Sequence, residues 1–197
     1  MTGYMAEMRK LVGHRTVMQC AASIICVDKE GRMLLGRRSD NHKWGYAGGA
    51  CEIDERAEDC AKRELFEEMG LTAEELVFFC VNSGPEAHYI YPNGDEVSNF
   101  EIVYLCRKWS GVPRAQDREM EELRFFSLGE IDLSEISPPI RSVVEAFTAK
   151  ARLCQSGGYD CLACLRCRGK RTAAEADYYR GRTEGSGNPK VYGKRFP

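Results

Sequence analysis

One helix, expected over residues 55–69, constrains the fold more than any other part of this chain. Acidic residues fill its first turn, where the positive end of a helix dipole favours them, and Asp54 just before it is a residue type that caps helices. Gly70 follows the last turn, as glycine often does at the end of a helix. Three apolar residues share one stripe along the helix: Ala57, Ala61 and Leu65. The stripe predicts that one face of this helix is buried.

Strand-forming segments on both sides of this helix predict a mixed sheet. Residues 17–27 and 32–38 are apolar runs separated by the turn-forming residues 28–31, which predicts a β-hairpin. Residues 139–151 predict a second amphipathic helix that closes the body. Four further strands are expected at residues 75–81, 88–91, 100–106 and 123–127.

The composition is typical of a globular protein, because 43% of the 197 residues are hydrophobic and 29% are charged. The longest apolar stretch, residues 21–27, is too short to span a bilayer, so no membrane partner is expected. Glu7, Arg9 and Lys10 interrupt the place where a signal peptide needs an apolar run, so we expect a cytoplasmic protein. The length favours one core with an appendage.

Charge divides the chain into two parts. Residues 1–149 contain 17 Lys and Arg against 26 Asp and Glu, whereas residues 150–197 contain 11 against 4. Beyond residue 152 the hydrophobic period ends and Gly, Arg and Lys dominate. We therefore expect one main domain over residues 1–151 and a basic, partly disordered extension over residues 152–197. The extension is interpreted first as a solvated tail, with contact to an anion, an RNA or the body as alternatives.

Three carboxylates crowd one patch of the helix. Glu64 and Glu67 are three residues apart and Glu64 and Glu68 are four apart, a spacing at which like charges repel. A hard divalent cation between the oxygens would relieve the repulsion, and Mg²⁺ or Mn²⁺ is the natural candidate. For a Glu-rich helix taken alone, a solvated acidic face is the commoner interpretation.

The residues around these carboxylates decide between the two interpretations. The fixed positions are Gly49, Glu55, Arg63-Glu64-Leu65, Glu67-Glu68 and Gly70-Leu71. They match every fixed position of the Nudix box, so the chain resembles a Nudix hydrolase. Two neighbours depart from the common pattern: Ala47 stands where proline often precedes the glycines, and Asp54 where glycine often precedes the box glutamate. Neither departure removes a metal ligand.

The resemblance implies an α+β fold, an α/β/α sandwich with the box helix on one face of a mixed β-sheet and the C-terminal helix on the other. It implies hydrolysis of a diphosphate linked to another group, with the help of bound cations. The implied ligands of Mg²⁺ or Mn²⁺ are Glu64, Glu67, Glu68 and the carbonyl oxygen of Gly49. Glu55 and Arg63 receive orienting or structural roles, with Arg63 aligning the carboxylates. Eight residues separate these two, about two helical turns, which is too far for a simple neighbour pair.

The group that removes a proton from the attacking water has two candidates. Members of the family use either a box glutamate or one on a later loop, which here gives Glu64 or Glu119. Glu119 lies in an acidic stretch that is also interpretable as ordinary surface charge. Arg37 and Arg38 are candidate phosphate ligands, and strand alternation sends their side chains to opposite faces. At most one of them is expected to reach the phosphate.

The favoured substrate is a nucleoside diphosphate linked to another moiety, of the ADP-ribose or nucleotide-sugar type. Alternatives are a nucleoside triphosphate, an RNA 5′ pyrophosphate held by the basic extension, and a Nudix-fold sensor that binds a metabolite without cleaving it. The intact box glutamates argue against the sensor. The expected partner is thus a small nucleotide-derived molecule; RNA is not favoured, and a homodimer stays open.

Four cysteines cluster in the extension: Cys154, Cys161, Cys164 and Cys167. Four thiolates suffice for a tetrahedral structural Zn²⁺ or an iron–sulfur cluster. Zn²⁺ is the metal we expect if one binds, and free thiols are the alternative and commoner outcome. The other six cysteines lie among apolar residues, as reduced thiols used as small hydrophobes do.

Overall fold

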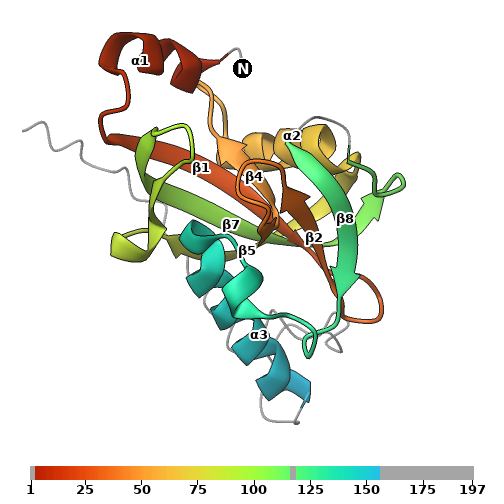
Figure 1. Ribbon diagram of the computed structural model, residues 1–197. Coiled ribbons are helices and arrows are strands. Elements are labelled where there is room, and N and C mark those ends of the chain that lie inside the picture. The colour runs from red at the N-terminus through yellow and green to blue at the C-terminus, as the bar shows by residue number, and fades with distance from the viewer. Residues whose placement is uncertain (1–2, 116–118, 156–197) are drawn as a thin grey trace, which may run out of the picture. The chain divides into compact units, whose positions relative to one another are not determined.

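The computed structural model describes residues 3–115 and 119–155 (Figure 1). The chain divides into two units, residues 1–165 and 166–197, and all described residues belong to the first. The helices of this unit are α1 (Tyr4–Val12), α2 (Ala57–Met69) and α3 (Arg141–Gln155), with short 3₁₀ turns at Pro85–Ala87, Leu133–Glu135 and Pro138–Ile140. Its strands are β1 (Val17–Cys26), β2 (Met33–Arg38), β3 (Trp44–Gly45), β4 (Ala47–Ala50), β5 (Thr72–Asn82), β6 (His88–Ile90), β7 (Glu96–Ser110) and β8 (Met120–Phe126).

The strands form two sheets. The larger sheet has the order β4-β1-β7-β5, and β6 also pairs with β7; the smaller one has the order β3-β2-β8. β1 and β7 run parallel, and β4 pairs antiparallel with β1. The predicted hairpin of residues 17–27 and 32–38 is therefore wrong, since β1 and β2 belong to different sheets, although one antiparallel bridge pairs Val27 with Met33 at the turn. The turn reverses the chain, but the neighbours of β1 are β4 and β7.

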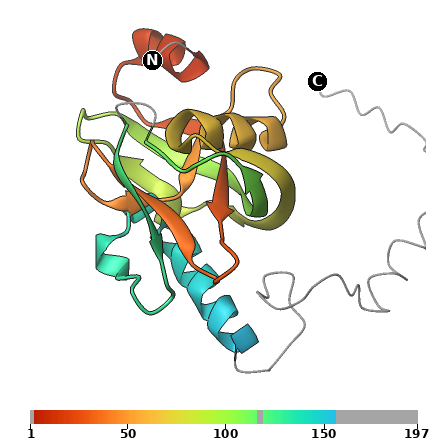
Figure 2. The same ribbon diagram turned by 90° about the vertical axis from the view of Figure 1, so that its right-hand side faces the viewer.

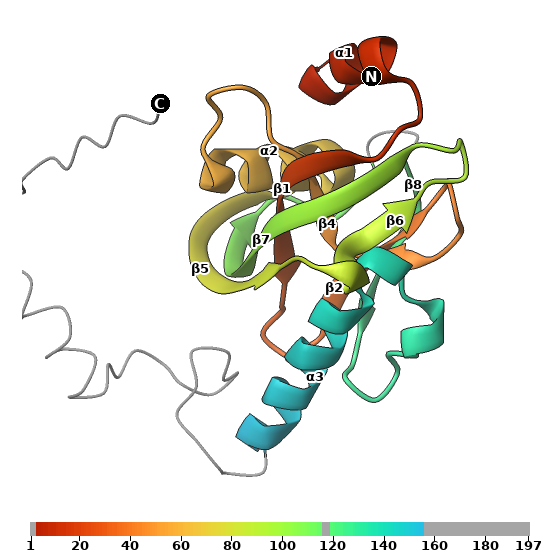
Figure 3. The ribbon, with the colours of Figure 1, turned by 90° about the vertical axis from the view of Figure 1, so that its left-hand side faces the viewer.

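Helices α2 and α3 cover opposite faces of the larger sheet (Figure 2; Figure 3). Along β1 the side chains alternate between two cores. Ile24 packs in the core that contains Leu65 of α2, and Ile25 packs in the core that contains Phe147 of α3. A strand buried on both faces forms a continuous apolar run, which explains why residues 21–27 carry no charge. The predicted mixed sheet with a helix on each face is confirmed.

The helix that carries the box begins later than expected. It starts at Ala57 with Arg56 as N-cap, and no side chain caps it. Asp54, the expected cap, lies further back in a turn, where it adopts a positive φ of 63°. Gly70 ends the helix in the left-handed conformation with φ of 70°, as predicted. The turn before α2 places Glu55 outside the helix, which matters for the site below.

The end of the body also differs in detail from the expectation. A 3₁₀ turn at Pro138–Ile140 leads into α3, which runs on to Gln155, past the expected end at Ala151. Cys154 thus lies in the last turn of α3, while Cys161, Cys164 and Cys167 are outside the described residues. The metal site predicted there stays a prediction. Within the described ranges, no helix has the length and apolarity needed to cross a membrane.

Candidate active site

Two glycines let strand β4 lie directly against its neighbours. A Cβ on Gly49 would stand 2.5 Å from the carboxylate carbon of Glu64, and a Cβ on Gly48 would overlap Ser23 of β1. Neither glycine has a positive φ, so glycine is needed here for the space that its absent side chain leaves and not for its backbone conformation. The backbone of β4 therefore comes close to the carboxylate of Glu64.

Glu68 is a buried carboxylate, with only 2% of the residue exposed. Its Oε2 accepts a hydrogen bond of 3.1 Å from the backbone N–H of Gly48. Burial raises the pKa of Glu68 well above its usual value, although the Arg38 charge and the Gly48 hydrogen bond oppose the shift. Glu64 raises this pKa further by repulsion. The positive charge of Arg38 and the Gly48 hydrogen bond thus do not fully offset the cost of burying the charged form of Glu68.

Glu64 lies next to Glu68 in the same environment. Its side chain is 15% exposed and accepts a hydrogen bond of 2.6 Å from the guanidinium of Arg63. Burial raises the pKa of Glu64, with Glu67 and Glu119 adding repulsion. Glu67 is different, because half of its side chain is exposed and it meets Arg63 at 3.1 Å. The three box carboxylates therefore range from fully buried to solvent-facing on one side of α2.

Arg63 connects the carboxylates to the preceding turn and to β4. Its guanidinium donates two hydrogen bonds of 2.8 Å to the two oxygens of Glu55 and one of 3.2 Å to the carbonyl of Ala50. The expectation that eight residues separate Glu55 and Arg63 too far for pairing was wrong. It assumed one continuous helix, whereas the turn before Ala57 brings Glu55 back beside Arg63. Arg63 thus contacts Glu55, Glu64 and Glu67 at once, and its orienting role stays a prediction.

The chemistry of these donors fits a hard divalent cation. Among residues 3–115 and 119–155, no three His, Cys, Asp or Glu side chains are already grouped as metal ligands. Glu64 and Glu68 nevertheless offer carboxylate oxygens. Burial opposes the ionisation of both groups, and repulsion from neighbouring carboxylates opposes it further. A cation with oxygen ligands would favour the ionised forms of both.

The two candidate arginines have different surroundings, as strand alternation predicts. Arg38 is largely covered, pairs with Asp40 at 2.9 Å and acts electrostatically on Glu68. Arg37 is more exposed and meets Glu121 at 3.5 Å. Only Arg38 lines the pocket beside Gly49. Of the pair, Arg38 is thus the one near the carboxylates.

Glu119, the second candidate for the general base, is close enough to both Glu64 and Glu68 to raise their pKa values by repulsion. It lies just before β8, and its carbonyl accepts a hydrogen bond of 2.9 Å from the N–H of Ser39. The fold therefore brings a carboxylate that follows Glu68 by 51 residues to the same site as the box.

Comparison with known proteins decides the family. The sequence profile of the NUDIX domain matches residues 18–147, more than half of the chain and all of the box. The chain belongs to the NUDIX family. Residues 49–71, which comprise the end of β4, the loop after it and helix α2, are thus the Nudix box of this protein.

Relatives of this NUDIX chain carry several names. It is 29% identical over 151 residues to the NAD-capped RNA hydrolase NudC of Actinobacillus succinogenes. This alignment covers 73% of this chain and 53% of that protein. It is 42% identical over 90 residues to a MutT-like protein of Streptomyces ambofaciens, and this alignment covers 46% of this chain and 52% of that protein. Among solved structures, the MutT NUDIX hydrolase of Burkholderia pseudomallei aligns with a TM-score of 0.55 and 27% identity over 66% of this chain and 97% of that one. The chain spans about half the length of these two curated relatives.

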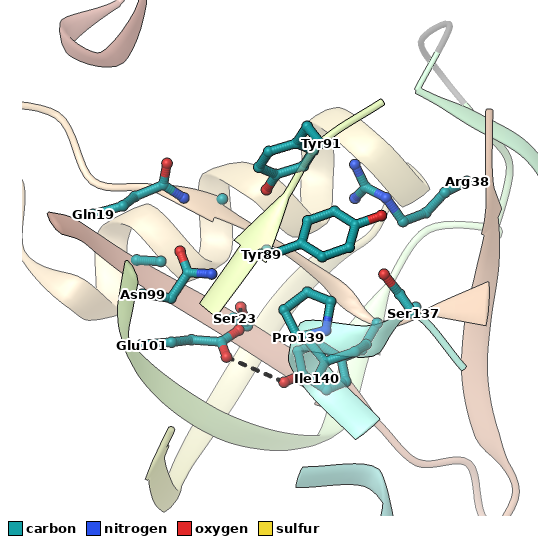
Figure 4. Close-up of a pocket in the computed structure, with 15 residues that line it drawn as sticks. Gln19, Ser23, Arg38, Tyr89, Tyr91, Asn99, Glu101, Ser137, Pro139 and Ile140 are labelled. Atoms are coloured by element: carbon teal, nitrogen blue, oxygen red, sulfur yellow. Dashed lines mark hydrogen bonds between the residues drawn. The ribbon is translucent and has the colours of Figure 1, made fainter. Parts of the chain in front are cut away.

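A polar network that the sequence analysis did not single out lies beside the box (Figure 4). Glu101 of β7 is 5% exposed and accepts hydrogen bonds from the hydroxyl of Ser23, the hydroxyl of Tyr46 at 3.3 Å and the amide of Asn82 at 2.8 Å. Glu101 and Ser23 line the same pocket as Gly48 and Gly49. In the sequence, this network is indicated only by a polar residue inside each of two apolar strands, Ser23 in β1 and Glu101 in β7.

Proposed function

We propose that this protein is a metal-dependent hydrolase that cleaves the pyrophosphate bond of a nucleoside diphosphate linked to another moiety. The observation that carries the proposal is the pair of covered carboxylates, Glu64 and Glu68, held against the side-chain-free backbone of Gly48 and Gly49. A surface acidic patch would have no reason to bury these groups, because burial opposes their ionisation.

The residues that would hold Mg²⁺ or Mn²⁺ are Glu64, Glu67, Glu68 and the carbonyl of Gly49. A bound cation supplies charge neutralisation for the pyrophosphate and for the charge that develops as water attacks phosphorus. Arg63 keeps the carboxylates oriented through its contacts with Glu55 and Ala50. The missing side chains at Gly48 and Gly49 leave room for phosphate oxygens to approach.

Two carboxylates are candidates for the group that accepts the proton of the attacking water. Glu64 lies within the box itself, and Glu119 approaches it from the loop before β8. A general base must be ionised before it accepts the proton, and a cation bound beside Glu64 would favour that ionised form. We favour Glu64, with Glu119 as the alternative, and place Arg38 as the phosphate-facing arginine.

The relatives support a dinucleotide-like substrate. Proteins named NAD-capped RNA hydrolase match this chain, and NAD contains a pyrophosphate between two nucleosides. A second candidate is a nucleoside triphosphate, which also contains the pyrophosphate linkage that a divalent cation and the box carboxylates would act on. An RNA 5′ end is the third, because relatives named RNA pyrophosphohydrolase also match a short segment.

A product screen tests the proposal. The full chain is incubated with ADP-ribose, nucleotide sugars, NAD, nucleoside triphosphates and 5′-triphosphorylated or NAD-capped RNA, each with Mg²⁺, with Mn²⁺ and with a chelator. We expect metal-dependent release of two monophosphate products from a linked diphosphate, identified by mass spectrometry. Glu68→Gln, purified in parallel, controls for contaminating phosphatases. Equal product from wild type and variant, or no turnover of any compound, would contradict the proposal.

A further inference from the structure

The pocket beside the Nudix box has one wall of polar side chains from two parallel strands. Asn99 and Glu101 are two residues apart on β7, so both project to the same face of the sheet, and Gln19 of β1 is the register partner of Asn99. Figure 4 shows these side chains on one side of the pocket and Tyr89, Tyr91 and Arg38 on the other. The space between the two walls is partly open to solvent.

Asn99 offers an acceptor that nothing in the described part of the chain satisfies. Its Nδ2 donates a hydrogen bond of 2.9 Å to the carbonyl of Ala87, which fixes the amide, because a flipped amide would set two oxygens against each other. Its Oδ1 is buried and has no hydrogen-bond partner among the described residues. Leaving a buried acceptor unpaired is unfavourable, so a ligand donor at this point would be stabilising.

Glu101 adds a second acceptor to the same wall. A carboxylate has about four acceptor positions, and Ser23, Tyr46 and Asn82 occupy three of them. Asn82 also donates to the carbonyl of Pro139 at 2.9 Å, so its amide cannot turn around to accept. All three neighbours are donors, and one acceptor position of the Glu101 carboxylate is left without a partner among the described residues.

The opposite wall is aromatic and close to positive charge. Tyr89 and Tyr91 meet edge to face, with ring centroids 4.9 Å apart. Aromatic rings at this position offer stacking or edge contacts to a planar heterocycle. Arg38 and Gly49, which also line the pocket, belong to the proposed phosphate end. A nucleotide would thus have its base between the tyrosines and the polar wall, and its phosphates toward the box.

We propose that this pocket selects bases bearing an exocyclic amino group, whose N–H donors pair with Asn99 Oδ1 and Glu101. An oxo group at the same ring position would face two acceptors and leave Asn99 Oδ1 unpaired. Asn99 and Glu101 are specificity-determining residues in this arrangement. The inference rests on the proposed function only for the orientation of the phosphates.

Binding of nucleoside monophosphates tests the selection without requiring turnover. Isothermal titration calorimetry of the full chain in the presence of a chelator compares AMP with IMP and CMP with UMP. We expect the amino member to bind at least about tenfold tighter in one or both pairs, since a buried group left unpaired commonly costs that much. A preference in only one pair supports the proposal and shows whether the pocket takes a purine or a pyrimidine. Equal binding within both pairs, or no binding at millimolar concentration, overturns it.

A variant assigns the preference to Asn99. Asn99→Leu removes the acceptor at similar size, and we expect the preference to fall to about threefold or less while the oxo nucleotide binds as before. Asn93→Leu, an amide in the turn between β6 and β7 that lies outside the pocket, is the matched control and keeps the preference. An unchanged preference in a folded Asn99→Leu protein overturns the assignment. If that variant does not fold, the wild-type nucleotide pairs still decide the selection, and failure of hydrolysis in the product screen leaves this test intact.

Discussion

The guanidinium of Arg63 donates one hydrogen bond of 2.8 Å to each oxygen of Glu55, although Glu55 precedes the helix that carries Arg63. The same guanidinium reaches Glu64 and Glu67, so a single side chain joins the entry turn of α2 to two box carboxylates. This bidentate pair is a positioning device, because it fixes the arginine that orients the carboxylates.

Glu55→Gln is expected to destabilise the protein by about 1–3 kcal/mol at pH 7, since it removes one charge from this pair. Arg63 lowers the pKa of Glu55 from 4.5 to about 2. A lowered pKa stabilises the fold above the unfolded-state value, and this contribution is lost as pH falls. In urea unfolding, the difference from wild type should shrink between pH 4.5 and pH 2. Glu74→Gln, an exposed carboxylate of β5, should show no such difference, and a constant gap for Glu55→Gln would contradict the pairing.

Glu68→Gln should make the metal-free protein more stable, by about 1 kcal/mol or more, because it removes a buried charge. The raised pKa of Glu68 means that wild-type stability declines as pH rises through that value, and the variant should lack this decline. Mn²⁺ should raise the melting temperature of wild type but not of the variant, while turnover falls at least about a hundredfold. Thermal melts with and without Mn²⁺ measure both effects. A variant that melts lower, or still responds to Mn²⁺, would count against this role.

Glu67→Gln should lower turnover at least about a hundredfold with little change in stability, since this carboxylate is half exposed. Chelation should abolish wild-type activity, and added Mg²⁺ or Mn²⁺ should restore it. Asp59→Asn, an exposed carboxylate on the same helix, is the control and should keep its activity. Near-normal rates for Glu67→Gln at saturating Mg²⁺ would contradict the assignment of Glu67 as a metal ligand.

Gly49→Ala should reduce turnover about a hundredfold or more, because its methyl group would stand 2.5 Å from the carboxylate of Glu64 and displace it. Gly129→Ala makes a matched comparison, since nothing lies within 4 Å of the added carbon there. Steady-state rates of the two variants test the close approach. Similar rates for both would show that the displacement of Glu64 is harmless.

A protein ending at Gln155 should keep its catalytic rate on small substrates, because the box and both covering helices precede that residue. The cut follows the last residue of α3 rather than Ala151, which lies in the buried core. Rates with an RNA substrate, measured in parallel, report whether the basic extension contributes to binding. A truncated protein that folds but does not turn over small substrates would show that the extension completes the site.

The sequence by itself determined the local features of this protein. The fixed positions of the box between Gly49 and Leu71 are all matched, and Gly70 ends α2 because glycine adopts a left-handed conformation without strain. The apolar stripe of α2 and the apolar face of α3 follow from helical periodicity, which depends only on neighbours three and four residues away. Such features can be predicted because their causes lie within one stretch of chain.

Tertiary structure alone decided which distant groups meet. The parallel pairing of β1 with β7 places Ser23 near Glu101 and Gln19 beside Asn99, and strand pairing of this kind leaves no local signal. The turn before α2 joins Glu55 to Arg63, and the approach of β4 buries Glu68, whose sequence neighbours resemble those of an exposed glutamate. Burial and charge compensation depend on contacts between separate segments, so the folded chain, and not its residue order, sets the chemistry of these carboxylates.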